Sequence, residues 1–265
     1  MGGVPVLMYH ALEDAANPSR AIDGEIGYVV GAEAFRRQLE FLSREGYRTL
    51  LLEEVAGSGS GKAVVITFDD GHESNLLLAL PLLQEYGFKA EFFVTTDWVG
   101  TDRYLSRSQV ATLQRDGMGV GSHGASHRFF SDLTPGDLER ELNGSRDVLH
   151  LATGIAPHTI SAPGGRFDSA VAARATAAGY RYFCTSIPGL FTGRAQGGII
   201  PVPRLAVRRN TTLDQYAKMV AGNRCLYAAA RVRYLALSML KKGLGSQRYV
   251  RLHGALSRWA NGSRK

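Results

Sequence analysis

Two adjacent carboxylates stand at the end of an apolar run in this chain. Residues 63–66 predict a short buried strand, and Gly71 permits a tight turn just after Asp69 and Asp70. Folds of the α/β class usually build their sites at the carboxyl ends of strands. Two carboxylates this close do not stay equivalent when a cation or a proton divides their roles. The pattern therefore predicts a functional site, although an Asp-Asp-Gly turn is also common in surface loops.

Two histidines provide a second cluster. His123 and His127 follow another strand-like segment, residues 117–121, and at their spacing two imidazoles can face one ion. Histidine nitrogens and a carboxylate oxygen suit zinc or a similar divalent metal, and they leave positions open for water and substrate. Alone, the pair is more typical of solvent-facing histidines in a glycine-rich loop. Together with Asp69 and Asp70, it favours a metal site.

The combination of motifs resembles the polysaccharide deacetylases of the NodB-homology type, carbohydrate esterase family four. The resemblance extends from about residue 4 to about residue 220, and the opening residues 4–10 are similar to the subgroup that includes poly-N-acetylglucosamine deacetylases. It implies a distorted (β/α) barrel in which Asp70, His123 and His127 are the metal ligands and Asp69 is the general base. The motifs that carry it are Thr67-Phe68-Asp69-Asp70-Gly71, His123-Gly124-Ala125-Ser126-His127 and Ser161-Ala162-Pro163-Gly164-Gly165.

These residue types also match the chemistry of amide hydrolysis, which needs a nucleophilic water, a polarised carbonyl and a proton for the departing amine. A metal with two histidine ligands and one aspartate ligand can bind both the water and the acetyl oxygen. The neighbouring carboxylate of Asp69 can take the proton from that water. Backbone N–H groups around Pro163, Gly164 and Gly165 can stabilise the oxyanion, and the resemblance favours the N–H of Gly164.

The general acid is not in its usual place. Most family members supply it from a late Leu-x-His motif, and no such motif follows residues 201–204. In the subgroup whose chain begins with a Tyr-His strand, the barrel order is permuted and an early histidine replaces the late one. The resemblance therefore implies that His10, which ends the apolar run 4–9, is the acid. Without the resemblance, a lone histidine after an apolar strand is more typical of a packed core residue.

The arginine that orients the base carboxylate is also displaced. Family members carry it two residues before the motif proline, and this chain has Ser161 there. Arg166 and Arg204 are the candidate replacements, because the rigid guanidinium fork suits a carboxylate. For either arginine taken singly, a surface position is the more common alternative.

Alternating strands and helices predict the scaffold. With 265 residues of which 45% are hydrophobic, the chain can form one enzyme domain. We expect an α/β fold in which about seven parallel strands form a distorted barrel over residues 1–221, and a basic helical extension over residues 222–265. The expected strands cover residues 4–9, 47–52, 63–66, 90–94, 117–121, 159–162, 180–185 and 202–207, and the expected helices cover residues 33–45, 76–86, 134–151 and 224–243.

The charge is distributed unevenly along the chain. Residues 215–265 contain 11 Lys or Arg and no acidic residue, so the preceding part has a net charge of about −4. The helix expected over residues 224–243 fits a basic amphipathic helix on an anionic membrane surface, and it fits equally a helix packed on the barrel with a solvated basic rim. No recognition motif accompanies the charge, so we expect no nucleic acid partner.

We predict a metal-dependent de-N-acetylase that hydrolyses acetamide groups of an N-acetylated exopolysaccharide or lipid-linked sugar and releases acetate. Zinc is the expected ion, with cobalt and nickel as alternatives. The competing hypotheses are an O-deacetylase or another metal-dependent amidase on the same scaffold, and a non-catalytic glycan-binding protein. Cys184 and Cys225 have no disulfide framework, and no secretory signal is visible, which predicts a cytoplasmic location. A secretion signal trimmed from the chain is the alternative, and the basic helix would allow peripheral contact with a membrane.

Overall fold

A computed structural model describes residues 3–18, 26–58, 61–166, 168–193 and 198–244. The strands are β1 (Val6–Tyr9), β2 (Leu12–Glu13), β3 (Val30–Gly31), β4 (Arg48–Thr49), β5 (Ala63–Phe68), β6 (Glu91–Val94), β7 (Gly119–Ser122), β8 (Thr159–Ser161), β9 (Tyr182–Cys184), β10 (Ile200–Val202) and β11 (Leu205–Ala206). The α-helices are α1 (Ala32–Arg44), α2 (Leu80–Glu85), α3 (Arg107–Arg115), α4 (Pro135–Glu139), α5 (Ser145–Thr153), α6 (Ser169–Ala177), α7 (Leu213–Val220) and α8 (Arg224–Leu244).

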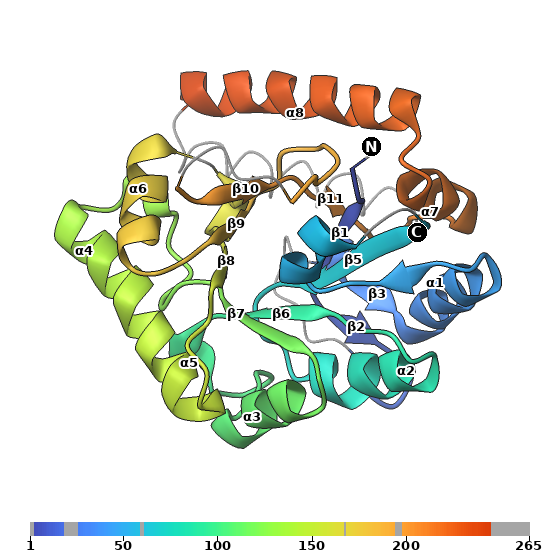
Figure 1. The fold of residues 1–265 in the computed structure, drawn as a ribbon, viewed down its shortest axis with the longest axis horizontal. Helices are drawn as coiled ribbons and strands as arrows, with labels where there is room; N and C mark the ends of the chain where they lie inside the picture. Colours follow the sequence, from blue (N-terminus) through green and yellow to red (C-terminus); the bar gives the residue numbers. More distant parts are fainter. Residues whose placement is uncertain (1–2, 19–25, 59–60, 167, 194–197, 245–265) are drawn as a thin grey trace, which may run out of the picture.

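The strands form a curled parallel sheet with helices around its outer face (Figure 1). The order along the sheet is β10-β9-β8-β7-β6-β5-β1-β11, β4 pairs with β5 beside this path, and β2 and β3 form a small sheet of their own. Because each strand is parallel to its neighbours, all the carboxyl ends meet at one edge. The predicted distorted (β/α) barrel is confirmed.

Side chains of the strands alternate between two buried environments. Leu7 and Phe68 pack outward in the cluster that joins the sheet to the helices. Val6, Val65 and Val202 pack inward with one another in a second cluster. Since successive residues of a strand face opposite sides, Asp69 continues the inward series of Val65, and the barrel interior becomes polar where the strands end.

The helices follow the predicted apolar periodicity. In α1, Phe35, Leu39 and Leu42 lie on one face and are buried. The helix predicted over residues 134–151 begins where expected, because the Thr134 side chain accepts a hydrogen bond from the backbone N–H of Asp137. It is not uniform, however. A π-helical turn, η6 (Arg140–Gly144), separates α4 from α5, and a similar turn, η3 (Asn75–Ala79), precedes α2.

Two predicted strands are wrong in extent. Of residues 47–52, only Arg48 and Thr49 form a strand. Leu50 still donates to the carbonyl of Val64, but the two following N–H groups are taken by side chains: Leu51 donates to Glu54 and Leu52 to the buried Glu91. The strand predicted over residues 202–207 is divided into β10 and β11 at Pro203 and Arg204. Pro203 has no N–H for a sheet ladder, and the N–H of Arg204 bonds to the carbonyl of Ile187.

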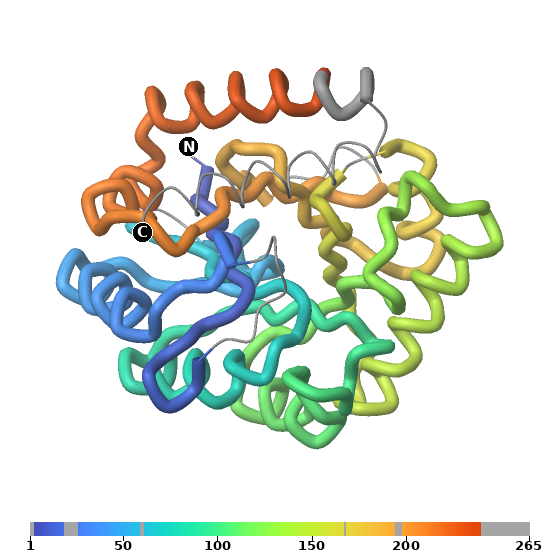
Figure 2. Tube along the Cα trace, turned by 180° about the vertical axis from the view of Figure 1, so that it is seen from behind, coloured from blue at the N-terminus to red at the C-terminus, as the bar shows by residue number. Residues whose placement is uncertain are grey.

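The predicted helix of the basic extension is present as α8, which crosses one edge of the molecule in both Figure 1 and Figure 2. Tyr227 is buried in the helix-facing core, and Leu226 and Ala230 pack against it. No helix in the described part of the chain combines the length and the apolar character needed to cross a membrane. Residues 245–265 of the predicted extension lie outside the described residues.

Candidate active site

The strand register brings the sequence motifs to one edge of the sheet. Tyr9 pairs with Phe68, so His10 and Asp69 follow side by side, and the N–H of Asp69 donates to the carbonyl of Tyr9 over 2.9 Å. Val94 pairs with Ser122, which places His123 one residue beyond β7. The remaining motif follows β8, and Arg204 follows β10.

Asp70, His123 and His127 form a compact group of potential metal ligands. Asp70 Oδ1 lies 3.3 Å from His123 Nε2 and 3.4 Å from His127 Nε2. Ligand atoms about 2.0–2.1 Å from a tetrahedral zinc lie about 3.3–3.4 Å from one another. Asp70 Oδ1 is also buried without a hydrogen-bond partner among the described residues, which would be costly without a cation. The three residues therefore fit a divalent metal, and the acidic and basic ligands that sequence reasoning combined do come together.

The ligand positions require unusual backbone. Asp70 and His127 have positive φ angles of 77° and 61°, in the left-handed region that non-glycine residues rarely adopt. Each such residue costs about 1–2 kcal/mol. The surrounding structure must hold both residues in place, and strain of this kind concentrates at functional sites.

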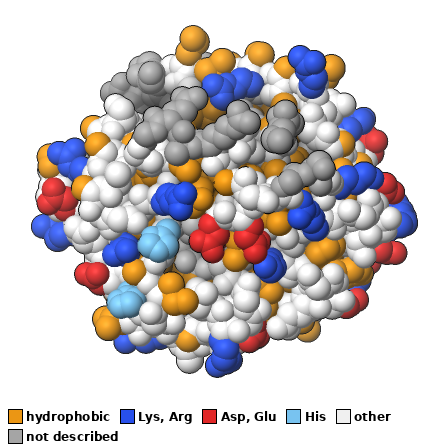
Figure 3. Space-filling model, in the orientation of Figure 1, with side chains coloured by type: hydrophobic (Ala, Val, Ile, Leu, Met, Phe, Trp, Pro, Cys, Tyr) orange, Lys and Arg blue, Asp and Glu red, His pale blue; other side chains and the backbone are white. Residues whose placement is uncertain are grey.

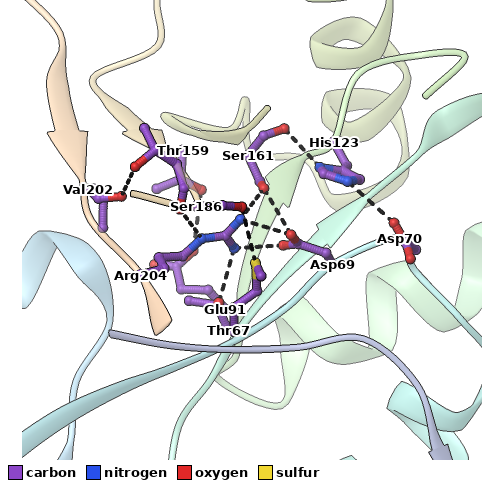
Figure 4. A network of polar contacts seen from close by, with 12 residues as sticks. Thr67, Asp69, Asp70, Glu91, His123, Thr159, Ser161, Ser186, Val202 and Arg204 are labelled. Atoms are coloured by element: carbon purple, nitrogen blue, oxygen red, sulfur yellow. Dashed lines mark hydrogen bonds and ion pairs between the residues drawn. The ribbon is translucent and has the colours of Figure 1, made fainter. Parts of the chain in front are cut away.

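Asp69 is held by an extensive network in the barrel interior (Figure 4). Its two carboxylate oxygens accept hydrogen bonds from Arg204 Nη1 at 2.7 Å and Arg204 Nη2 at 2.8 Å. Ser161 Oγ donates to Asp69 Oδ2 over 3.2 Å and accepts from Arg204 Nη2 over 2.8 Å. Burial raises the pKa of the Asp69 carboxyl, but the Arg204 and His123 charges outweigh burial and bring that pKa below its ordinary value. Asp69 is thus an ionised carboxylate beside the ligand group.

Arg204 is therefore the arginine that contacts the base candidate, and Arg166 is not. Arg204 is almost fully buried and also donates to the carbonyl of Thr185 and to the Thr67 hydroxyl. Arg166 lies over the Phe129 ring, 4.4 Å from its centroid, and forms an ion pair with Asp132. Ser161 fills the position of the usual family arginine, and its hydroxyl accepts a hydrogen bond from the guanidinium of Arg204, which follows β10.

Three residues of the turn after β8 are the predicted stabilisers of the oxyanion, and one of them has a backbone N–H that is not used within the turn. Pro163 has no N–H, and the N–H of Gly165 donates to the carbonyl of Ala162 over 2.7 Å. The N–H of Gly164 remains as the oxyanion-binding candidate. Gly164 has a φ of 68°, and a Cβ atom there would lie 2.5 Å from Phe129 Cε1, so only glycine fits.

His10 lies near the carboxylates but is held differently. Its ring packs on Tyr28 with centroids 4.6 Å apart, and its Nδ1 is buried with no hydrogen-bond partner among the described residues. Burial lowers the pKa of the His10 imidazole, and the nearby Asp70 and Asp69 only partly compensate. The structure thus places His10 close enough to Asp69 and Asp70 for their charges to act on it, and its role as the acid stays a prediction.

Sequence reasoning missed one residue of the site's surroundings. Glu141 is buried and accepts hydrogen bonds from the loop between His123 and His127. No motif marks it, because a glutamate within a helix is common, and only a π-helical turn directs it inward. Trp98 also contacts the site, with its ring 4.8 Å from the His127 ring.

Comparison with known proteins agrees with this geometry. The sequence profile of the family described as polysaccharide deacetylase matches residues 56–183. YxkH of Bacillus subtilis (strain 168), which is named after the same family, is 30% identical over 204 residues, covering 73% of this chain and 68% of its own length. This chain belongs to the polysaccharide deacetylase family. It is a hydrolase of the carbohydrate deacetylase type.

Two further relatives define the range of the similarity. The crystal structure of BC0361, a polysaccharide deacetylase from Bacillus cereus, is 28% identical in sequence to this chain and matches it with a TM-score of 0.73. The match covers 82% of this chain and 69% of the BC0361 chain. The poly-beta-1,6-N-acetyl-D-glucosamine N-deacetylase of Escherichia coli (strain K12) is 22% identical over 267 residues. That match covers 82% of this chain but only 38% of the Escherichia coli protein, so this chain spans well under half of that relative's length.

Proposed function

We propose that this deacetylase hydrolyses the acetamide group of an N-acetylated sugar in an exopolysaccharide or a lipid-linked glycan, and releases acetate. One observation carries the proposal: a buried, ionised carboxylate, Asp69, lies directly beside the group formed by Asp70, His123 and His127. A base next to a ligand group of this kind is what the activation of water requires.

Asp70, His123 and His127 would hold the metal, and two imidazoles with one carboxylate suit zinc. A divalent ion there would act as a Lewis acid on the acetyl carbonyl and lower the pKa of water. Asp69 takes the proton of the attacking water, because its carboxylate is ionised and Arg204 fixes its orientation.

The remaining steps use the two other predicted groups. The N–H of Gly164 donates to the oxyanion that develops on the acetyl oxygen, and no described residue competes for this donor within its own turn. His10 donates a proton to the departing nitrogen. Burial lowers the pKa of its imidazole, so the protonated form gives up its proton readily, and the Asp70 and Asp69 carboxylates offset part of this lowering.

Support for an amide rather than an ester substrate comes from two sources. An amine is a poor leaving group without a proton, so a dedicated acid such as His10 matters more for acetamides than for acetate esters. The Escherichia coli relative is named as a poly-beta-1,6-N-acetyl-D-glucosamine N-deacetylase. An O-deacetylase on the same residues is the second candidate, and it would need His10 much less.

The test is acetate release from a substrate panel. Oligomers of β-1,6- and β-1,4-linked N-acetylglucosamine and an O-acetylated glycan are incubated with chelator-treated protein, before and after addition of zinc, cobalt or nickel. We expect metal-dependent acetate release from at least one N-acetylated oligomer. Release from the O-acetylated glycan alone would favour the second candidate. Binding of a glycan without release of acetate from any substrate would favour the non-catalytic hypothesis.

We also propose that α8 contacts an anionic lipid surface. Val232, Leu235 and Met239 on this helix are 67%, 48% and 75% exposed, and the adjacent Arg231 and Arg233 are exposed as well. Figure 3 shows hydrophobic and basic side chains together along the edge over α8. Because residues 215–265 contain no acidic residue, two copies of this helix would repel one another, whereas an anionic surface would attract it.

Co-sedimentation with vesicles tests this contact. The protein is expected to bind vesicles that contain phosphatidylglycerol and not vesicles of phosphatidylcholine alone, and Val232→Glu is expected to weaken the binding. Equal binding to both compositions, or binding that Val232→Glu leaves unchanged, would contradict the proposal.

A further inference from the structure

The two histidine ligands are anchored very differently. His123 is almost fully buried, and its Nδ1 contacts the carbonyl of Ser161 at 2.8 Å, which orients the ring. The side chain of His127 is 30% exposed, and its described ring contacts are the rings of His123 and Trp98. Its backbone also has the unfavourable φ of 61°. The position of His127 therefore depends on whatever holds the loop just before it.

Glu141 holds that loop. Its Oε2 accepts hydrogen bonds from the backbone N–H of Ala125 at 2.7 Å and of Ser126 at 3.0 Å, and its Oε1 accepts one from the Ser126 hydroxyl. These three donors belong to two consecutive residues, Ala125 and Ser126, which lie between the two histidine ligands. The Glu141 side chain is nearly inaccessible to solvent, and no lysine or arginine of the described residues forms an ion pair with it. The hydrogen-bond donors of the loop are therefore the polar partners of this carboxylate.

The helical segment that supplies Glu141 is itself fixed. Glu141 lies in the π-helical turn η6, and the next residue, Leu142, is fully buried in a hydrophobic cluster. The Ser145 hydroxyl donates to the carbonyl of Glu141 at 2.6 Å and contacts Ser122 Oγ at 2.7 Å. Ser122 Oγ accepts in turn from the N–H of Gly124. The segment from η6 to α5 is therefore hydrogen-bonded to the loop between His123 and His127 at two points. Ser145 and Ser122 connect it to the start of the loop, and Glu141 binds the middle of the loop.

We propose that Glu141 is a positioning residue that sets the metal affinity of the site by fixing the loop that carries His127. The proposal rests on the proposed function, because it requires Asp70, His123 and His127 to bind a metal. Partners that orient ligands from outside the coordination sphere typically change metal affinity by about 10- to 100-fold. An effect of that size is expected when Glu141 loses its carboxylate oxygens.

Three substitutions of Glu141 separate position from charge. Glu141→Ala removes all three hydrogen bonds and leaves two backbone N–H groups without their acceptor. Glu141→Asp keeps the charge but is one methylene too short to reach the same donors. Glu141→Gln loses the charge, yet its amide oxygen can accept from both N–H groups while its NH₂ donates to the Ser126 hydroxyl. We expect affinity near that of the unsubstituted protein for Glu141→Gln, and about 10- to 100-fold weaker binding for the other two.

Two further variants serve as controls. Glu139→Gln removes a negative charge from a nearby exposed residue that forms no hydrogen bond to the loop in the described part of the chain. Leu138→Ala opens a cavity at a buried position of α4 and destabilises the fold, but it removes none of the three hydrogen bonds that Glu141 accepts from the loop. Both variants are expected to bind metal like the unsubstituted protein in the folded fraction.

The experiment measures binding of Zn²⁺ and Co²⁺ to the full chain at fixed pH, by competition with a chromophoric chelator, and records the visible absorption of bound Co²⁺. The proposal predicts weakened binding and an altered Co²⁺ spectrum for Glu141→Ala and Glu141→Asp only. Unchanged affinity of Glu141→Ala, or an equal loss in Leu138→Ala, would overturn the role of Glu141 while leaving the metal site intact. Failure of the unsubstituted protein to bind either ion would instead refute the metal site, and this inference with it.

Discussion

Replacing Arg204 by methionine tests the arrangement around the base candidate most directly. The guanidinium is buried and donates two hydrogen bonds to the carboxylate of Asp69, which is itself buried. Arg204→Met keeps most of the apolar volume but leaves this carboxylate without its counterion. Removing one partner of a buried ion pair typically destabilises a protein by about 3–5 kcal/mol. We expect a loss of that size at neutral pH, together with a lower kcat, because Asp69 is no longer held in one orientation.

The loss should depend on pH in a defined direction. The pKa of the Asp69 carboxyl is below its ordinary value, so the ion pair contributes stability above the unfolded-state pKa of about 4, and this contribution is lost only as the pH falls through the folded-state value. In Arg204→Met, burial becomes the main influence and raises the pKa of Asp69. The destabilisation should then shrink by up to about 1.4 kcal/mol for each pH unit below that raised pKa, because a protonated Asp69 no longer needs a counterion.

Urea unfolding of the chelator-treated protein at several pH values between 5 and 8 measures this effect. Asp69→Asn in the Arg204→Met background should recover part of the lost stability, because it removes the unpaired charge. Arg166→Met is the matched control, and its partly exposed ion pair with Asp132 should contribute less than about 1 kcal/mol. A loss that is equal at all pH values, or as large in Arg166→Met, would refute this account of Arg204.

Two more predictions concern the remaining catalytic assignments. Asp69→Asn should retain metal and lower kcat by about 10²- to 10⁴-fold, whereas Asp70→Asn should lose the metal, as metal analysis and acetate release will measure. Normal metal content and turnover in both variants would exclude the mechanism. His10→Ala should keep metal and KM but lose kcat and one limb of the pH–rate profile, with a smaller effect on an O-acetylated substrate. A pH profile that does not change in the folded fraction would mean that His10 only packs against Tyr28.

Much of the scaffold could be predicted because it depends on local periodicity. The apolar spacing of Phe35, Leu39 and Leu42 specifies an amphipathic helix whatever it packs against, and α1 begins and ends within one residue of the predicted bounds. The Thr134 cap is equally local. The errors arise where distant groups compete for the backbone. Leu52 gives its N–H to Glu91, which no pattern near residue 52 reveals. The domain boundary after residue 221 and the cytoplasmic location stay predictions.

The site divides in the same way. The sequence by itself determined the two aspartates and the two histidines as candidates, because adjacent aspartates after a strand and histidines four residues apart are constrained by short stretches of chain, and the family resemblance divided them into ligands and base. Parallel strands then bring such stretches to one edge whatever their separation. Only the tertiary structure decided which arginine holds Asp69 and which residue holds the histidine loop. Arg204 lies 135 residues from Asp69, and Glu141 acts from a separate helical segment through backbone N–H groups that any residue could supply. Contacts of this kind depend on register, burial and direction, which residue spacing does not encode.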